Sequence, residues 1–199
     1  LQFVIAHRFG TLNSGAYELW GIDQSTMRMS FDYGVTEGLA IGVARNSFQK
    51  TFESSVKAKL VKQKMEMGSP ISITSYNAVF VNTLRWINPE RENLFSSRLS
   101  YAHQIMIARK FNQNLSLQLT PSFLHRNLVE TSAMKNDYMA LGMGGRYKLS
   151  KRVSVNIEYF YQLDRPEEDF SNSLSVGFDI ETGGHVFQLH VTNSQGMFE

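Results

Sequence analysis

The feature that most constrains this chain is a pair of alternating segments between residues 138 and 163. From residue 138 to residue 149, apolar side chains alternate with small or polar ones, and after a short polar turn the same alternation continues to residue 163. Successive side chains of a strand point to opposite faces, so this pattern predicts a hairpin with one apolar and one polar face. Each arm has about eleven residues, which is the length that a tilted strand needs to cross a bilayer.

Similar alternation recurs along the whole chain. We expect further strands near residues 1–10, 27–35, 39–44, 51–63, 71–86, 99–110, 115–123, 174–181 and 186–191. Together with the hairpin, these segments make about eleven strands, each followed closely by the next.

Two of the expected strands contain irregularities. In the segment 71–86, Ile73 falls on one phase of the alternation, whereas Tyr76 and Phe80 fall on the other. A bulge near Ser75 would bring these apolar residues onto one face. Pro121 interrupts a second strand, because proline has no N–H to donate to a sheet.

The connections indicate a membrane barrel rather than a soluble sandwich, which would show the same alternation. Tight turns are expected at 36–38, 112–114, 150–152 and 183–184, and long polar links at 11–24, 87–98, 129–137 and 164–172. The two kinds fall at opposite ends of the strands, with a short link at 46–50 as the exception. Aromatic residues also gather near the strand ends. Both features are typical of outer-membrane barrels, whose backbone must be fully paired in lipid.

The sequence therefore predicts an all-β fold, an antiparallel up-and-down transmembrane β-barrel, located in the bacterial outer membrane. Residues 1–199 form a single domain with about eleven strands. Bacterial barrels usually have an even number of strands, so we expect about twelve in the intact protein, together with a signal peptide.

A resemblance supports this prediction. The segments HRFGTLNSGAYELWGIDQ, FDYGVTEGLAIGVARN, LTPSFLHRN and DIETGGHVFQLHVTNSQGMFE are similar to an uncharacterised family of bacterial outer-membrane β-barrel proteins, typical of Bacteroidota. The resemblance covers most of the chain and implies the barrel fold and the outer-membrane location. It implies no activity, because the family is a domain of unknown function.

The polar face supplies the candidate functional residues, since it would line the lumen. These candidates are Arg8, Arg28, Asp32, Glu53, Lys57, Lys59, Lys110, Arg146, Lys148, Glu158, Asp179, Glu181 and His190. Within this set we expect Arg146 to contact Glu158, and Asp179 or Glu181 to be reached by another basic group. Charges of both signs would either form a salt-bridged plug or line a narrow, selective pore.

Other chemistry finds little support in the sequence. The net charge of +2 is too small to indicate nucleic-acid binding. The chain has no cysteine, which excludes disulfides, thiolate metal sites and a cysteine nucleophile. No two histidines have the spacing that metal sites commonly use, so we expect no bound metal. Parity puts Ser122 and His125 on opposite faces of their strand, so a catalytic serine–histidine pair is not expected. We therefore predict that the protein is not an enzyme and binds no cofactor. The glycine-rich run 142–145 lies inside a strand, which argues against a phosphate loop.

A narrow channel for small solutes is the leading functional prediction. The alternatives are a structural or partner-binding barrel with a plugged lumen, an outer-membrane lipid hydrolase and, outside the membrane class, a soluble β-sandwich binding module. The expected partners are outer-membrane lipid and a small solute, and the sequence identifies no protein partner.

Overall fold

The computed structural model describes residues 1–64, 68–129, 131–132, 134–163 and 171–194. Its strands are β1 (Gln2–Phe9), β2 (Ser25–Gly34), β3 (Leu39–Asn46), β4 (Thr51–Val61), β5 (Ser72–Asn82), β6 (Leu99–Lys110), β7 (Leu115–Arg126), β8 (Asp137–Lys148), β9 (Val153–Gln162), β10 (Ser173–Glu181) and β11 (Val186–Thr192). Short 3-10 helices, η1 (Leu12–Ser14), η2 (Ala16–Gly21), η3 (Phe48–Lys50) and η4 (Phe95–Arg98), lie in the connections. In the described part of the chain, no helix has the length and apolar character needed to span a membrane.

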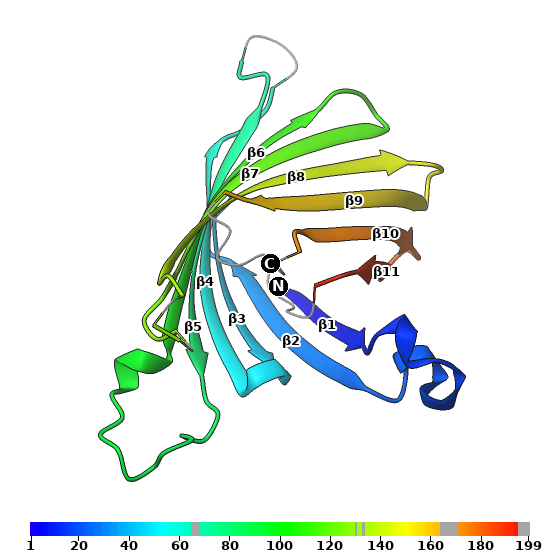
Figure 1. Cartoon of the computed structure of the whole chain (residues 1–199). Coiled ribbons are helices and arrows are strands. Elements are labelled where there is room, and N and C mark those ends of the chain that lie inside the picture. Colours follow the sequence, from blue (N-terminus) through cyan, green and yellow to red (C-terminus); the bar gives the residue numbers. More distant parts are fainter. Residues whose placement is uncertain (65–67, 130, 133, 164–170, 195–199) are drawn as a thin grey trace.

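All eleven strands form one sheet, in which each strand pairs antiparallel with its neighbours in sequence. The sheet curls into a barrel whose edges are β1 and β11 (Figure 1). Both edges are odd-numbered strands of an antiparallel meander, so they run in the same direction. The side chain of Arg8 on β1 bridges this seam by donating to the backbone carbonyl of Ser194, which follows β11. The predicted all-β, up-and-down architecture is confirmed.

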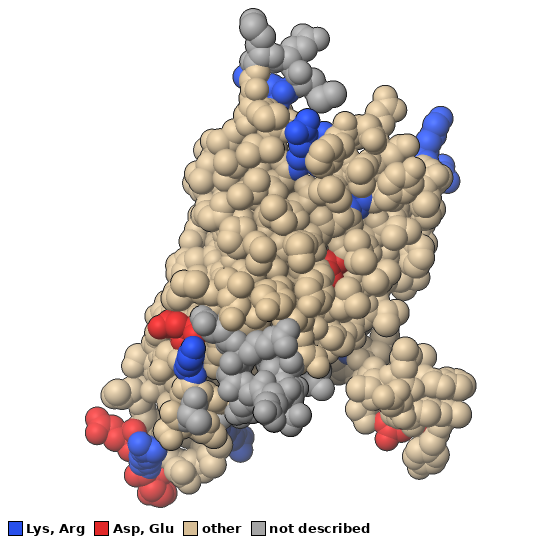
Figure 2. All heavy atoms as spheres, turned by 45° about the horizontal axis from the view of Figure 1, so that its top comes forward, with Lys and Arg blue, Asp and Glu red and all other residues tan. Residues whose placement is uncertain are grey.

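The alternation along each strand separates an apolar outer wall from a polar inner wall. On β10, Leu174 and Val176 are 43% and 40% exposed, whereas Asp179 is 5% exposed. A soluble sandwich would bury such apolar side chains against a second sheet. In Figure 2 most of the visible charged side chains lie toward the two ends of the molecule, and the wall between them is largely uncharged. This distribution suits a barrel surrounded by lipid.

The hairpin of β8 and β9 has the predicted register. Arg146 lies opposite Asn156, and the backbone N–H of Leu149 donates to the carbonyl of Val153 at the turn. β10 and β11 also pair across the tight turn expected at 183–184, with Gly177 opposite His190.

The expectation for β5 was wrong. Its pairing with β6 is continuous through Ser75, so β5 itself has no bulge there. The irregularity lies on the neighbouring strand, between Lys59 and Val61 of β4. Instead, Tyr76 and Phe80 point into the barrel, where they are 1% and 7% exposed. The apolar residues of β5 occur on both phases because this part of the inner wall is packed rather than wet. The cluster consists of Tyr76, Ala78, Phe80 and Ala102, with Met106 packed against it.

Pro121 affects only one of its two neighbours. It pairs with Leu141 of β8. On the other side, β6 and β7 pair at Gln104–Ser122 and again at Ile107–Leu119, and the ladder is interrupted between these two pairs. The missing N–H of the proline explains the interruption, because a ladder hydrogen bond cannot form at that position.

The connections sort into two rims, which we call the turn rim and the loop rim. The turn rim carries the tight turns 35–38, 111–114, 149–152 and 182–185, and the loop rim carries the links 10–24, 47–50, 83–98, 127–136 and 163–172. The sorting is as predicted, although residues 164–170 of one expected long loop lie outside the described residues. The exception is the link 62–71 between β4 and β5, which is longer than the other connections of the turn rim (Figure 1).

Candidate functional site

The inner wall of the barrel gathers most of the polar residues and differs between its two sides. The first side, formed by β2 to β6, is filled by side chains, and we call it the packed side. The second, formed by β7 to β11 together with β1, borders an open space, and we call it the hollow side.

A buried ion pair forms the centre of the packed side. Arg28 on β2 and Glu53 on β4 are each 6% exposed, and Nη2 of Arg28 lies 2.9 Å from Oε2 and 3.0 Å from Oε1 of Glu53. The hydroxyl of Tyr76 on β5 donates to Oε1 of the same glutamate at 2.8 Å. The glutamate therefore accepts hydrogen bonds from two neighbouring elements, as a buried carboxylate requires.

Small residues on β3 make this ion pair possible. Ala44 is the inward residue of β3 opposite Glu53, so the arginine and glutamate side chains meet over a methyl group. The next inward residue of β3 is Gly42. A Cβ added there would lie 2.7 Å from Oδ1 of Asp32 and 2.6 Å from Oγ of Ser55. Small side chains on the middle strand thus allow long polar ones on its neighbours to fill the lumen.

A second, looser pair extends the packed side toward the turn rim. Nζ of Lys57 lies 3.8 Å from Oδ1 of Asp32 and 5.6 Å from the ring centroid of Tyr76. The phenol ring therefore contacts a cation on one side while its hydroxyl binds a carboxylate, which ties the two pairs into one polar network.

The hollow side encloses a cavity of about 500 Å³. Its principal polar lining comes from Arg8, Arg146, Asn156, Glu158, Asp179, Gln188 and His190. The volume falls within the range of pockets that hold small molecules. Gly144 also lines it, and a Cβ there would meet nothing closer than 3.9 Å, so the wall is open at this point.

Arg146 organises the acidic groups of the hollow side. Its Nε lies 3.3 Å from Oδ2 of Asp179, and its Nη2 donates to Oε1 of Glu181 at 3.2 Å. The guanidinium reaches over β9 to β10, which is possible because the inward residue of β9 beside Asp179 is the small Ser154, whose Oγ accepts from Nε of Arg146 at 3.0 Å. Gln188 of β11 donates to Asp179 from the other side at 2.9 Å.

The expected contact between Arg146 and Glu158 was therefore wrong. Arg146 turns away from the diagonal neighbour on β9 because two carboxylates on β10 offer it a pair of acceptors. Glu158 lines the cavity, and it forms no salt bridge with any residue in the described part of the chain.

His190 occupies space left by a glycine. It lies opposite Gly177, and a Cβ added to that glycine would come within 2.6 Å of the carbonyl oxygen of Leu189 and would overlap the imidazole of His190. Phe160 covers Gly142 in the same way, at 2.6 Å. Glycines of the inner wall thus make room for large neighbours, as a strand interior of this kind requires.

The remaining predicted lumen residues lie at the ends of the barrel or the seam. Lys59 and Lys110 follow the inward phase of β4 and β6 but are exposed at the turn rim. Arg8 lies at the seam, where it also lines the cavity. The lumen candidates taken from the sequence did not include Tyr76, Ser154 or Gln188. Alternation along the same strand relates Ser154 to Glu158 and Gln188 to His190, whereas the facing of Tyr76 depends on how β5 pairs.

The hydrolase-like pair does not assemble. Ser122 is buried on the inner wall, where its hydroxyl donates to the carbonyl of Thr120. His125 points outward, where Nδ1 lies 2.6 Å from Oδ1 of Asp137 and Nε2 lies 2.9 Å from Oδ1 of Asn127. Among the described residues, no group of three or more His, Asp or Glu side chains is arranged to hold a metal ion.

The geometry is thus a wall of paired charges around a polar cavity, inside a barrel with an apolar exterior. A comparison with curated proteins and one with solved structures give no match to this chain. A family model described as a membrane-bound beta barrel domain (DUF5777) matches residues 1–199. The chain therefore belongs to this family of membrane-bound β-barrel domains of unknown function.

Proposed function

We propose that this barrel lies in the bacterial outer membrane and provides a narrow polar passage for small solutes. The observation that carries the proposal is the cavity of about 500 Å³ on the hollow side, which is lined by charges of both signs. A space of this size, bordered by Arg146, Glu158 and His190, suits a small hydrated solute better than an apolar ligand.

The outer-membrane location is supported by the connections. An up-and-down barrel with tight turns at one rim and mostly longer links at the other is the usual architecture of outer-membrane proteins. Aromatic residues with an arginine stacked on the ring lie near both rims, at Trp86 with Arg98 (3.8 Å) on the loop rim and at Phe111 with Arg109 (4.8 Å) on the turn rim. Such amphipathic pairs suit the membrane interface.

Conductance of the purified protein in planar lipid bilayers tests the proposal. In KCl we expect discrete steps smaller than those of porins with ~16–18 strands, because the packed side fills part of the lumen. Ser175→Trp should lower the conductance, since Ser175 lines the cavity. Val176→Trp is the matched control, because the neighbouring side chain faces outward and the bulky ring would meet lipid instead. Steps that are absent, or that both variants leave unchanged, would contradict the passage.

The second candidate function is a structural barrel with a plugged lumen. It is favoured by the ion pair of Arg28 and Glu53 with Tyr76, which are buried in the lumen on the packed side. If the plug extends across the barrel, the wild-type protein should not conduct although it folds and inserts. Neither role requires a catalytic step.

A further inference from the structure

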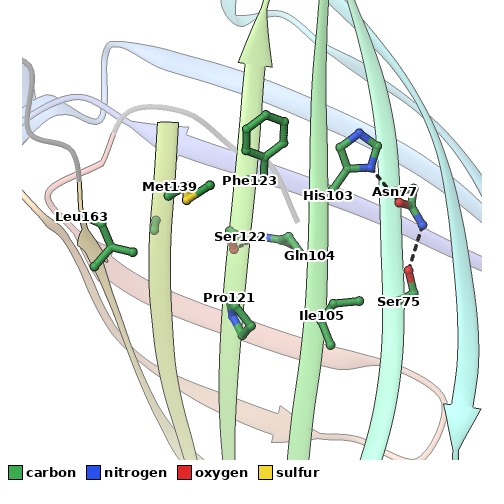
Figure 3. A pocket seen from close by; sticks show the side chains of 11 residues that line it. Ser75, Asn77, His103, Gln104, Ile105, Pro121, Ser122, Phe123, Met139 and Leu163 are labelled. Carbon is green, nitrogen blue, oxygen red and sulfur yellow. Dashed lines mark hydrogen bonds between the residues drawn. The ribbon is translucent and has the colours of Figure 1, made fainter. Parts of the chain in front are cut away.

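The outer wall between β5 and β8 carries a groove that the function of the lumen does not explain. It has a volume of about 330 Å³ and is lined mainly by Asn77, His103, Ile105, Pro121, Phe123 and Met139. Figure 3 shows Pro121 and Ile105 at one end of it and Phe123, His103 and Asn77 at the other, nearer the loop rim. The groove lies where the pairing of β6 with β7 is interrupted at Pro121.

A row of hydrogen-bonded polar side chains lies along one side of this groove. Nδ2 of Asn77 donates to Oγ of Ser75 at 2.9 Å, and Oδ1 of Asn77 lies 2.8 Å from Nδ1 of His103. The ring of His103 also stacks near that of Phe123, with 6.3 Å between the ring centroids. This distance falls within the range of about 4.5–7 Å that is typical of aromatic pairs. Polar groups facing hydrocarbon are costly unless they are paired. The row therefore satisfies itself as far as its own atoms allow.

Donor and acceptor accounting within the row leaves the second N–H of Asn77 Nδ2, the O–H of Ser75 and one ring nitrogen of His103, Nε2, without a partner inside the row. Because the amide nitrogen of Asn77 donates to Ser75, its oxygen faces His103 and accepts from Nδ1–H. A neutral imidazole with a proton on Nδ1 carries a lone pair on Nε2. The groove thus presents a hydrogen-bond acceptor above an apolar floor.

The surroundings of the groove determine what can cover it. The chain belongs to a membrane-bound family, and many large apolar side chains are exposed on the outer wall, so membrane lipid is the medium that this face meets. Tyr101, His125 and Asp137 lie two residues nearer the loop rim than the row, which places the row just below polar groups of the interface. An amphipathic molecule oriented with its polar end toward the loop rim matches both ends of the groove.

We propose that this groove binds one membrane lipid, whose acyl chain lies over Ile105 and Pro121 and whose headgroup donates a hydrogen bond to Nε2 of His103. The ligand class is a lipid with an N–H or O–H donor in its headgroup. A primary ammonium, as in phosphatidylethanolamine, and the hydroxyls of a phosphoglycerol or sugar headgroup both have this chemistry. The quaternary ammonium of phosphatidylcholine does not.

The test is native mass spectrometry of the full chain in detergent, titrated with phosphatidylethanolamine, phosphatidylglycerol and phosphatidylcholine of identical acyl chains. We expect one bound lipid per chain. The additional hydrogen bond should make the Kd for phosphatidylethanolamine about five- to ten-fold lower than that for phosphatidylcholine. A similar preference for phosphatidylglycerol would assign the donor to a hydroxyl as well as to an ammonium. His103→Phe should abolish the preference. His7→Phe is the matched control, because His7 lies on the outward phase of β1 and outside the groove.

Two results would overturn the proposal. Equal affinity of the wild-type protein for phosphatidylethanolamine and phosphatidylcholine would exclude a donor-specific site, and this comparison needs no variant. A dimer that dissociates in His103→Phe but not in His7→Phe would show that the groove contacts a second protein copy instead of a lipid.

Discussion

On the packed side of the lumen, the side chains of Arg28 and Glu53 bind each other where they are 7% and 5% exposed, whereas on the hollow side the side chains of Arg146 and Glu181 meet where they are 42% and 41% exposed. Both sides use the same geometry, in which a long basic side chain crosses one strand to reach a carboxylate on the next. They differ in what surrounds the pair. Tyr76 and Phe80 exclude solvent on the packed side, and glycine or serine leaves room for it on the hollow side.

The difference teaches that the size of the inward residues, rather than the charges, decides whether a lumen wall is a plug or a passage. The inward phase of β5 and β6 carries Tyr76, Phe80 and Met106. The inward phase of β8 carries Gly144, which lines the cavity, and Gly142, which Phe160 covers. An ion pair in the first setting is a structural element, because breaking it leaves a desolvated charge. In the second setting Asp179 is buried, but Arg146 and Glu181 are partly hydrated and are available to a solute.

The largest expected effect comes from breaking the buried pair. Arg28→Ala leaves Glu53 buried without its counter-ion and should lower the free energy of unfolding by about 3–5 kcal/mol. Urea denaturation of the protein folded in detergent measures this change. The double variant Arg28→Met with Glu53→Leu should recover much of the loss, because it removes both charges and keeps the volume. A loss below about 1 kcal/mol for Arg28→Ala, the value typical of an exposed pair, would remove the distinction between the two sides.

A smaller effect tests whether the hollow side is a wall between lumen and lipid. Val176 points outward and Ser175 borders the cavity, although they are adjacent on β10. Val176→Arg should cost about 2–4 kcal/mol near the middle of the bilayer, and Ser175→Arg should be tolerated better. Folding yield and unfolding in lipid vesicles provide the measurement. Equal tolerance at the two positions would mean that the strand does not separate two environments.

The smallest effect on stability, and the sharpest on function, is expected for Glu158. It lines the cavity and has no salt-bridge partner among the described residues, so Glu158→Gln should change stability by less than about 0.5 kcal/mol. Removing its charge should shift the ion selectivity of the passage toward anions. The reversal potential in a KCl gradient measures that shift. A large loss of stability with unchanged selectivity would instead place Glu158 in a packed lumen like that of the other side.

Much of this architecture follows from the sequence, because strand periodicity is a local property. Alternation between residues 138 and 163 is enough to predict the β8–β9 hairpin, its register and the faces of its side chains. The same rule places Asp179 opposite Gln188 and Gly177 opposite His190. Apolar residues alternate with polar ones, and the chain has no long apolar run, so the sheet must have two different faces. Tight turns between consecutive strands make neighbouring strands antiparallel.

Only the tertiary structure decided which charges meet and where the lumen is filled. Arg146 bonds to Asp179 and Glu181 rather than Glu158, since a long side chain selects among several neighbours by the space between strands and not by sequence distance. Tyr76 and Phe80 point inward because apolar residues on both phases of β5 leave the facing ambiguous until the strand pairs with β4 and β6. The sequence by itself determined the strands, their order and most of their faces. The closed curvature of the sheet decided the packed side, the hollow side and the groove on the outer wall, because these arise from side chains on strands that are distant in sequence.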